Sequence, residues 1–346
     1  MSNRRSFLSL LATLPVSILA APAATAGPDR GPRPVEVSQR TVPLSARSDE
    51  PVRTVRSGAP FSMVGLRFSG RPPADVMQLR VPGGAWLTVE QAGDAQASQP
   101  AWTGPTREVQ VRALRGGAPA TDVAVVLIDP GRSPADARLR TARDGGYPVI
   151  TREGWGADES LRCMQPQYSD GVRAVALHHT AGANDYGPED SPAIVRGIYA
   201  YHAQTLGWCD IGYHALVDRY GQVFEGRAGG LDRAVIGAHS GGFNLHTSSA
   251  AMMGSYTGQE AGEAQRRALA DYLDWKLGVH GLDPTATTTL TCRGGGTSRY
   301  PEGAQVSVPV LFGHRDVGHT ECPGDDGYAL LPGLRSAAAA TASPAK

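Results

Sequence analysis

The stretch AVALHHT, residues 174–180, decides the fold of the C-terminal half of the chain. Its continuous apolar run, 174–177, predicts a strand that is buried on both faces. Two imidazoles, His178 and His179, follow directly where this strand ends, and loops at such a sheet edge can leave a ligand position open. Because neighbouring strand residues face opposite sides, only one of the two histidines can enter a site there.

A second cluster of candidate ligands lies in GHRDVGHTECPG, residues 313–324. It offers His314 and Cys322, eight residues apart on a loop. Two imidazoles and one thiolate hold zinc tetrahedrally and leave one position free for water. The sequence lacks the paired cysteine spacings of an all-cysteine zinc finger, so a structural finger is not indicated.

Strands and helices alternate around these motifs. Ser191 and Pro192 are typical of a helix start, as N-cap and first helical residue, and the helix is predicted to run to about residue 205. Residues 214–226 predict a hairpin, and residues 258–279 predict a second helix. The apolar run 308–313 predicts a short edge strand leading into the second cluster. This alternation is typical of an α/β fold.

The N-terminal half has a different pattern. Residues 58–130 alternate with period two between Gly and Pro turns, which predicts a smaller all-β, sandwich-like domain. It contains no His and no Cys, so we expect an accessory role or that of a plain spacer. A flexible leader, 27–57, and a linker, 131–147, are predicted on either side of it, and a disordered tail at 336–346.

The first 26 residues read as a signal peptide. Arg4 and Arg5 precede an apolar run that is too short for a transmembrane helix, and small residues suit cleavage before Gly27. The arginine pair resembles a twin-arginine signal, which exports folded proteins. The alternative is an ordinary secretory signal. Either way the mature chain is expected outside the cytoplasm, without a membrane span.

Length and charge limit the possible functions. A chain of 346 residues predicts two domains. Its 33 Lys and Arg equal its 33 Asp and Glu, so it lacks the positive field of a nucleic-acid binder or of a polybasic membrane-surface protein. We therefore expect neither nucleic acid nor, after signal cleavage, a membrane among its partners.

Four separated blocks carry a specific resemblance: VALHHTAG, WCDIGYHALVDRYGQVFEGR, IGAHSGGFN and GHRDVGHTECPGD. In order and spacing they resemble the peptidoglycan recognition protein and phage-lysozyme-type family of N-acetylmuramoyl-L-alanine amidases, over residues 148–335. The resemblance implies a mixed central sheet flanked by helices and hydrolysis of the amide between N-acetylmuramic acid and L-alanine in peptidoglycan. We expect a secreted or cell-wall associated monomer, with the all-β domain touching the wall or acting as a spacer.

The resemblance also implies the site residues. The first His of the HHT block, the His of GHR and the Cys of CPG bind Zn2+ in that family, which implies His178, His314 and Cys322 as ligands here. His179 would then pack beside the site. The Tyr of the GYH block corresponds to Tyr213, whose hydroxyl would help to hold the developing oxyanion.

Four further residues match family positions. Thr320 stands where phage relatives have Lys and resembles recognition-type amidases, which implies an oxyanion or substrate contact and not an acid. His239 and Asn244 are expected to touch substrate, or else to stabilise a turn. Arg227 is expected to bind a peptide carboxylate, or else to form a surface ion pair. The general acid or base stays open among three candidates, Asp316, His319 and Glu321.

The remaining cysteines bear on the compartment and the function. An oxidising exterior favours a disulfide between Cys163 and Cys209, the alternative being two buried free thiols. The pairing state of Cys292 stays open. A non-catalytic peptidoglycan-binding receptor is an alternative function, because family members without the ligand cysteine bind without cleaving. A wall scaffold is another alternative. Cys322 is present, which favours the enzyme.

Overall fold

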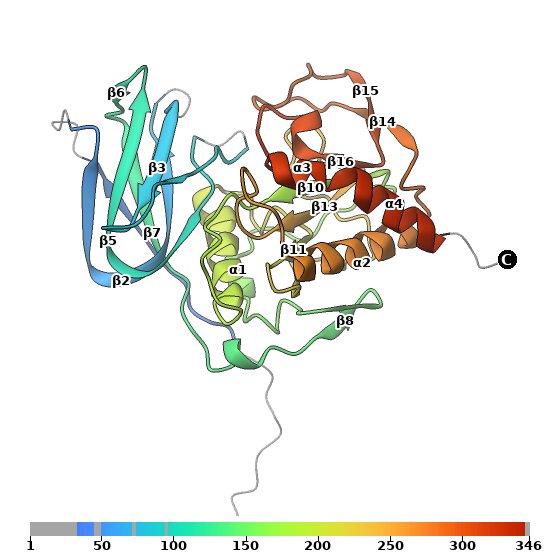
Figure 1. Ribbon diagram of the computed structural model, residues 1–346, viewed down its shortest axis with the longest axis horizontal. Helices are drawn as coiled ribbons and strands as arrows, with labels where there is room; N and C mark the ends of the chain where they lie inside the picture. The colour runs from blue at the N-terminus through green and yellow to red at the C-terminus, as the bar shows by residue number, and fades with distance from the viewer. Residues whose placement is uncertain (1–32, 45–49, 71–73, 94–95, 343–346) are drawn as a thin grey trace, which may run out of the picture. The chain divides into compact units, whose positions relative to one another are not determined.

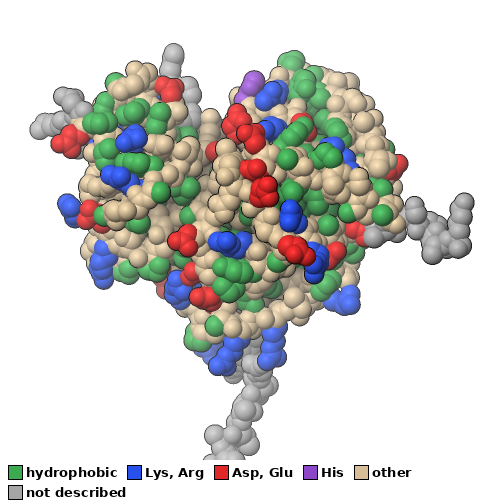
Figure 2. Space-filling model, viewed as in Figure 1, with side chains coloured by type: hydrophobic (Ala, Val, Ile, Leu, Met, Phe, Trp, Pro, Cys, Tyr) green, Lys and Arg blue, Asp and Glu red, His purple; other side chains and the backbone are tan. Residues whose placement is uncertain are grey.

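The computed structural model describes residues 33–44, 50–70, 74–93 and 96–342. The segment Pro32–Lys346 forms one compact unit, and the predicted signal peptide lies outside the described residues. Basic and acidic side chains are interspersed over the face shown in Figure 2, with no large patch of one sign. None of the described helices is long and apolar enough to cross a membrane.

The N-terminal part is a single antiparallel sheet in the order β1-β7-β2-β5-β3-β4, with β6 beside β5 (Figure 1). The prediction of an all-β region is confirmed. Its strands form one continuous hydrogen-bonded sheet, in which the pairing of the long β2 and β5 is interrupted by register shifts, and its buried side chains form a separate apolar core. The strands are β1 (Ser38–Pro43), β2 (Arg53–Phe68), β3 (Val76–Arg80), β4 (Leu87–Thr88), β5 (Ala101–Arg115), β6 (Ala118–Pro119) and β7 (Val123–Asp129).

Two of these strands reach into the predicted flexible leader, 27–57. β1 pairs with β7 from Ser38 to Pro43, and β2 begins at Arg53. The side chains of β1 are only exposed or half-buried, so its period-two signal is weak, yet its backbone completes one edge of the sheet. The leader prediction is therefore wrong for these residues.

The C-terminal part is built on a mixed five-stranded sheet in the order β12-β11-β13-β10-β16. β10 is parallel to β13 and β16, β11 is parallel to β13, and β11 and β12 form the predicted hairpin. The prediction of a mixed sheet flanked by helices is confirmed. The strands are β10 (Ala174–His179), β11 (Ala215–Val217), β12 (Val223–Glu225), β13 (Thr247–Met252) and β16 (Leu311–Gly313), and the helices are α1 (Ser191–Ala200), α2 (Glu263–Val279), α3 (Asp325–Ala329) and α4 (Leu331–Ala342).

Shorter elements connect these layers. A π-helical turn, Tyr201–Thr205, extends α1. Two separate hairpins join β8 (Ala142–Asp144) to β9 (Tyr147–Val149) and β14 (Thr287–Thr291) to β15 (Gln305–Pro309).

Alternation along the strands divides their side chains between two faces. Leu216 of β11 and Ala251 of β13 share a buried cluster with Ile194 of α1. The next residue of β13, Met252, packs instead in the cluster that contains Leu273 of α2. α2 and α4 run side by side over this second face (Figure 1). The mixed sheet is thus the middle of three layers.

α4 occupies most of the predicted disordered tail. Leu331, Leu334 and Ala338 recur at helical spacing and are buried in the α2 cluster. Alanine is the strongest helix former, so the Ala-rich segment continues the helix once this face is buried. The tail prediction is wrong as far as Ala342.

The antiparallel sheet packs directly against α1 and the π-helical turn. Met63 of β2 shares the buried cluster of Ile194. Tyr201 donates its hydroxyl to the carbonyl of Leu66 at 3.3 Å, and its ring fills the space that a Cβ on Gly65 would need. The antiparallel sheet and the helical segment of α1 and its π-helical turn therefore share apolar packing and a hydrogen bond.

This packing predicts a stability difference between two glycines of β2. Gly65→Ala should lower the free energy of unfolding by about 1–3 kcal/mol, because the new Cβ would lie 2.5 Å from the buried Tyr201 ring. Gly58→Ala, on the exposed part of the same strand, meets no atom within 4 Å and should change it by less than about 0.5 kcal/mol. Chemical denaturation measures both, and equal stabilities would contradict the packing.

Candidate metal centre and its pocket

The register of two parallel strands places two histidines side by side. Leu177 of β10 is paired with Gly313, the last residue of β16, so the next residues along the chain are His178 within β10 and His314 directly after β16. Because strand side chains alternate, both lie on the face that carries Phe312. Their ring centroids are 4.6 Å apart, close to the spacing of neighbouring strands.

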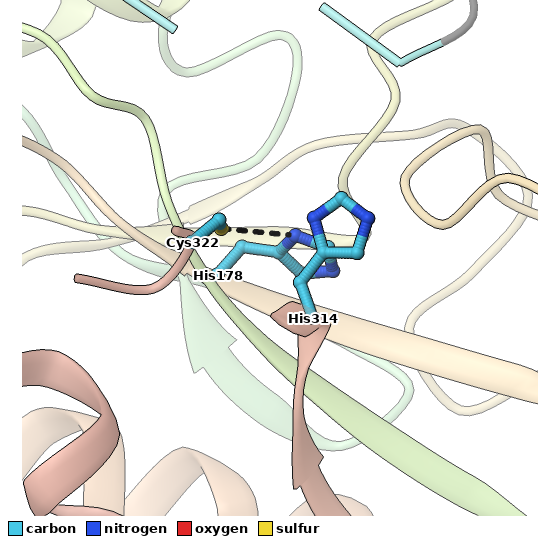
Figure 3. A group of neighbouring side chains, drawn as sticks. All are labelled: His178, His314 and Cys322. Atoms are coloured by element: carbon cyan, nitrogen blue, oxygen red, sulfur yellow. Dashed lines mark hydrogen bonds between the residues drawn. The ribbon is translucent and has the colours of Figure 1, made fainter. Parts of the chain in front are cut away.

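The loop after β16 returns Cys322 to the same place (Figure 3). Thr320 Oγ1 accepts the backbone N–H of Cys322 at 3.1 Å, which orients the turn. Cys322 Sγ lies 3.6 Å from His178 Nδ1 and accepts the backbone N–H of His179 at 3.3 Å. Ligand atoms of His178, His314 and Cys322 all lie within 4.8 Å of one another, so these residues form a candidate metal site.

Burial sets the protonation of the three groups. It lowers the pKa of His178 well below its ordinary value, with the charge of His314 adding to the shift, and it lowers the pKa of His314 to about 4. It raises the pKa of the Cys322 thiol well above its ordinary value. Both imidazoles therefore offer lone pairs at neutral pH, and the thiol ionises when a cation compensates its charge. This donor set fits a divalent metal ion.

Hydrogen bonds distinguish His178 from its neighbour. His179 accepts the backbone N–H of Tyr256 at Nδ1 (3.3 Å), and its Nε2 bonds Glu90 Oε1 (2.9 Å). Both nitrogens of His179 are thus occupied by protein groups. The Nδ1 of His178 faces the sulfur of Cys322, so the geometry favours His178 as the ligand and gives His179 a packed position.

A chain of imidazoles fixes the tautomer of His178. Its Nε2 lies 3.1 Å from Nδ1 of His239, which is also 3.1 Å from Ser240 Oγ. With a metal ion at its Nδ1, His178 would keep its proton on Nε2 and donate it in the bond to His239, which would then carry its own proton on Nε2. That second Nε2 is buried, belongs to a residue bordering the pocket, and finds no hydrogen-bond partner among the described residues. It can therefore donate to a bound ligand.

Tyr213 stands beside this chain. Its ring centroid is 5.4 Å from that of His178, and the residue borders the same pocket. Burial raises the pKa of the phenol well above its ordinary value. The hydroxyl consequently stays protonated and is a hydrogen-bond donor at every physiological pH.

The pocket is lined by both parts of the chain. The antiparallel sheet supplies four residues that the sequence did not predict as site residues: Glu90, Gln91, Gly93 and Gln99. No local pattern marks them, because their approach depends on how the two sheets pack. The mixed-sheet part supplies His179, Ala181, Trp208, Tyr213, Ala238, His239, Ser240, Gly241, Asn244, His314, Thr320 and Cys322.

Asn244 holds a turn at the pocket. Its Oδ1 accepts the backbone N–H groups of His239 at 2.8 Å and Ser240 at 2.9 Å. The carbonyl of the side chain is therefore committed to the turn, as the second of the two predicted roles requires. Only the amide end of Asn244 is left for a ligand.

Arg227 has neither of its two predicted roles. Its guanidinium is buried and donates to the carbonyls of Ile211 at 3.1 Å and Trp208 at 3.4 Å. It is not among the residues that border the pocket. Arg227 thus holds the loop that leads to Tyr213.

The same loop is tied by a disulfide. The predicted bridge between Cys163 and Cys209 is confirmed, and it joins residues 46 positions apart. The next residue, Asp210, accepts a hydrogen bond from the buried Arg152 at 3.0 Å. Cys292, whose pairing the sequence left open, is a free buried thiol.

Several known proteins are similar to part of this chain. A family model described as N-acetylmuramoyl-L-alanine amidase matches residues 167–325. Peptidoglycan-recognition protein SC2 of Drosophila melanogaster is 30% identical over 181 residues, which cover 52% of this chain and 82% of that protein. Peptidoglycan recognition protein 1 of Bos taurus is 31% identical over 194 residues, covering 56% and 86%. The solved structure of wild-type Drosophila PGRP-LB aligns with a TM-score of 0.41 and 23% identity, covering 52% and 90%.

Fold and site together define an α/β domain whose strand ends converge on two histidines and a cysteine. The chain belongs to the family of peptidoglycan recognition proteins and N-acetylmuramoyl-L-alanine amidases, since it covers more than four fifths of the two relatives at 30% and 31% identity. The resemblance inferred from the four sequence blocks is confirmed. The antiparallel sheet lies outside the matched residues 167–325.

A buried carboxyl behind the loop predicts a pH dependence of stability. Burial raises the pKa of Glu225 from 4.5 to about 7, and its Oε2 accepts the backbone N–H of Arg152. Between these two pH values the Glu225 carboxyl keeps its proton in the folded protein but loses it in the unfolded protein. The free energy of unfolding therefore falls as the pH rises from about 4.5 to about 7. Glu225→Gln keeps the neutral form and the acceptor. The difference in unfolding free energy between this variant and wild type should therefore grow, by about 1–3 kcal/mol in favour of the variant, as the pH rises from about 5 to 8.

Chemical denaturation of both proteins at several pH values in this range measures the difference. A difference that does not change with pH would contradict the prediction.

Proposed function

We propose that the chain is a zinc-dependent N-acetylmuramoyl-L-alanine amidase that hydrolyses the amide between N-acetylmuramic acid and L-alanine in peptidoglycan. One observation carries the proposal: ligand atoms of His178, His314 and Cys322 meet within 4.8 Å at a pocket that Tyr213 borders. The amidase family model and the relatives named for peptidoglycan recognition support the substrate.

Zinc fits the three donors. A nitrogen about 2.0 Å and a sulfur about 2.3 Å from a tetrahedral zinc lie about 3.5 Å apart. His178 Nδ1 and Cys322 Sγ are 3.6 Å apart. Thiolate and imidazole together select zinc over magnesium or calcium, which prefer oxygen ligands. When bound, zinc would supply Lewis-acid polarisation of the scissile carbonyl and a lowered pKa for water.

The protein groups around these donors have complementary tasks. The backbone N–H of His179 offsets part of the thiolate charge on Cys322. The protonated hydroxyl of Tyr213 and the Nε2–H of His239 are donors for the oxygen that becomes negative as the amide carbonyl is attacked. Thr320, whose hydroxyl already orients the backbone of Cys322, borders the same space as a substrate contact.

We further propose that the protein acts as a monomer outside the cytoplasm, secreted or associated with the cell wall. The signal-like residues 1–26, with their arginine pair, support export by a twin-arginine route. The equal numbers of acidic and basic residues suit a polymer of mixed charge.

The metal requirement can be tested with two cysteines that are both free and buried. Cys322→Ser should remove bound zinc and lower the release of free peptide amino termini from purified peptidoglycan by more than about 100-fold. Removal of a ligand exceeds the 10–100-fold effect of losing an outer partner. Cys292→Ser is the matched control, because Cys292 does not border the pocket, and it should keep both zinc and cleavage.

Metal analysis and a terminal-amine assay, each with and without a chelator, measure these effects. Cleavage that survives Cys322→Ser or chelation would contradict a zinc amidase. Binding of peptidoglycan by the zinc-loaded wild type without any cleavage would instead identify a receptor.

A further inference from the structure

Glu90 belongs to the antiparallel-sheet part of the chain but lies at the candidate metal centre. It follows β4 by two residues, and it borders the pocket together with His314 and Cys322. Its Oε1 bonds His179 Nε2 at 2.9 Å, and its Oε2 accepts the hydroxyl of Thr320 at 3.4 Å. A carboxylate oxygen can accept more than one hydrogen bond, so Oε2, with this single long bond, has a lone pair available to a reacting group.

The position of this carboxylate is fixed by the surrounding chain. The backbone at Gln91 forms a β-bridge with Ser98. The next residue, Gln99, accepts a hydrogen bond at Oε1 from His202 Nε2 (3.1 Å), since the Nδ1 of His202 accepts the N–H of Gly212. Hydrogen bonds such as that between His202 and Gln99 restrict the conformations open to the segment that carries Glu90.

The other acidic groups near the centre are committed elsewhere or exposed. Asp316 accepts the hydroxyl of Tyr328 at one oxygen (2.7 Å) and the N–H of Gly313 at the other (2.9 Å). Glu321 is 79% exposed at its side chain and faces Arg315 at 3.7 Å. Glu90 is the carboxylate that borders the pocket beside the cysteine.

The electrostatics of Glu90 suit a group that begins as a base. Burial raises its pKa, but the hydrogen bond and charge of His179, with the charge of His314, outweigh burial and hold the pKa below its ordinary value. The carboxylate is therefore ionised at neutral pH. Its negative charge adds to the effect of burial in raising the pKa values of Tyr213 and Cys322, which border the same pocket.

We propose that Glu90 is a catalytic residue of the amide hydrolysis, the group that moves the proton from the attacking water to the leaving nitrogen. The inference rests on the proposed amidase function. Water loses a proton to Glu90 Oε2 as its oxygen bonds to the lactyl carbonyl carbon. The protonated Glu90 then returns that proton to the L-alanine nitrogen as the carbon–nitrogen bond breaks. One water is consumed, a carboxylic acid and an amine are released, and Glu90 ends ionised.

The test uses the full mature chain loaded with zinc and a soluble muramyl-L-alanyl peptide. Glu90→Gln keeps the size of the side chain and an acceptor for His179 but cannot take up the proton. It should lower kcat by about 100-fold or more, with KM within about threefold of wild type. Zinc content, thermal stability and calorimetric affinity for an uncleavable muramyl peptide should stay unchanged. Glu108→Gln, in an exposed ion pair with Arg56 on the same sheet, is the matched control and should behave as wild type.

A second variant guards against misfolding and separates chemistry from positioning. Glu90→Ala should be inactive but regain activity in proportion to added formate, which a merely structural role would not produce. A Glu90→Gln enzyme with kcat within threefold of wild type, or one whose lost activity follows lost zinc or stability, overturns the inference. If wild type cleaves the peptide and the Glu90 variants cleave it at the same rate, only the role of Glu90 is refuted. Failure of wild type itself to cleave refutes the amidase function and this inference with it.

Discussion

The parallel pairing of β10 with β16 is the constraint on which the site depends. It aligns Leu177 with Gly313, so the next residue of each strand is a histidine on the same face of the sheet. A slip of one residue in either strand would turn one of the two imidazoles toward the helices on the other side. The apolar residues resist such a slip, because Leu311 and Phe312 pack in different cores on opposite faces. The geometry of the candidate metal ligands His178 and His314 therefore depends on the packing of the hydrophobic core.

Hydrogen bonds also determine which imidazole nitrogens are free to bind a metal ion. His178 and His179 are adjacent but have different partners. His178 forms a hydrogen bond with His239, whereas His179 bonds both the backbone N–H of Tyr256 and the carboxylate of Glu90. Buried imidazoles without such partners would be free to change tautomer or to compete for the metal. The low pKa of His314 and the high pKa of Cys322 mean that burial favours uncharged donors. A bound cation changes that balance for the thiol, which couples metal affinity to pH.

The sequence predicts those parts of this arrangement whose signals are local. The grouping of His178, His314 and Cys322, the place of Tyr213 at the pocket and the disulfide could be predicted, because each residue lies in a short block with its own pattern of residues and spacing. Weakly alternating β1 and the Ala-rich α4 were missed because their order comes from pairing and burial and not from their own composition. Arg227 was misassigned because sequence shows a charge but not the carbonyls of Ile211 and Trp208 that surround it. Glu90, 88 residues before His178, carries no signal until the two sheets pack.

The same packing argues against the antiparallel sheet being an independent accessory domain. Such a domain would bury its apolar residues in its own core. Met63, Trp102 and Ile128 are instead buried in one cluster with residues of α1. Removing the sheet would expose this cluster to water, at about 25 cal/mol for each Å² of apolar surface. It would also remove Glu90, Gln91 and Gln99 from the pocket. These side chains lie outside residues 167–325, which the family model matches, yet they border the same pocket as His314 and Cys322. The shape of the pocket therefore depends on the packing of the antiparallel sheet against the rest of the chain as well as on the residues of the family motif.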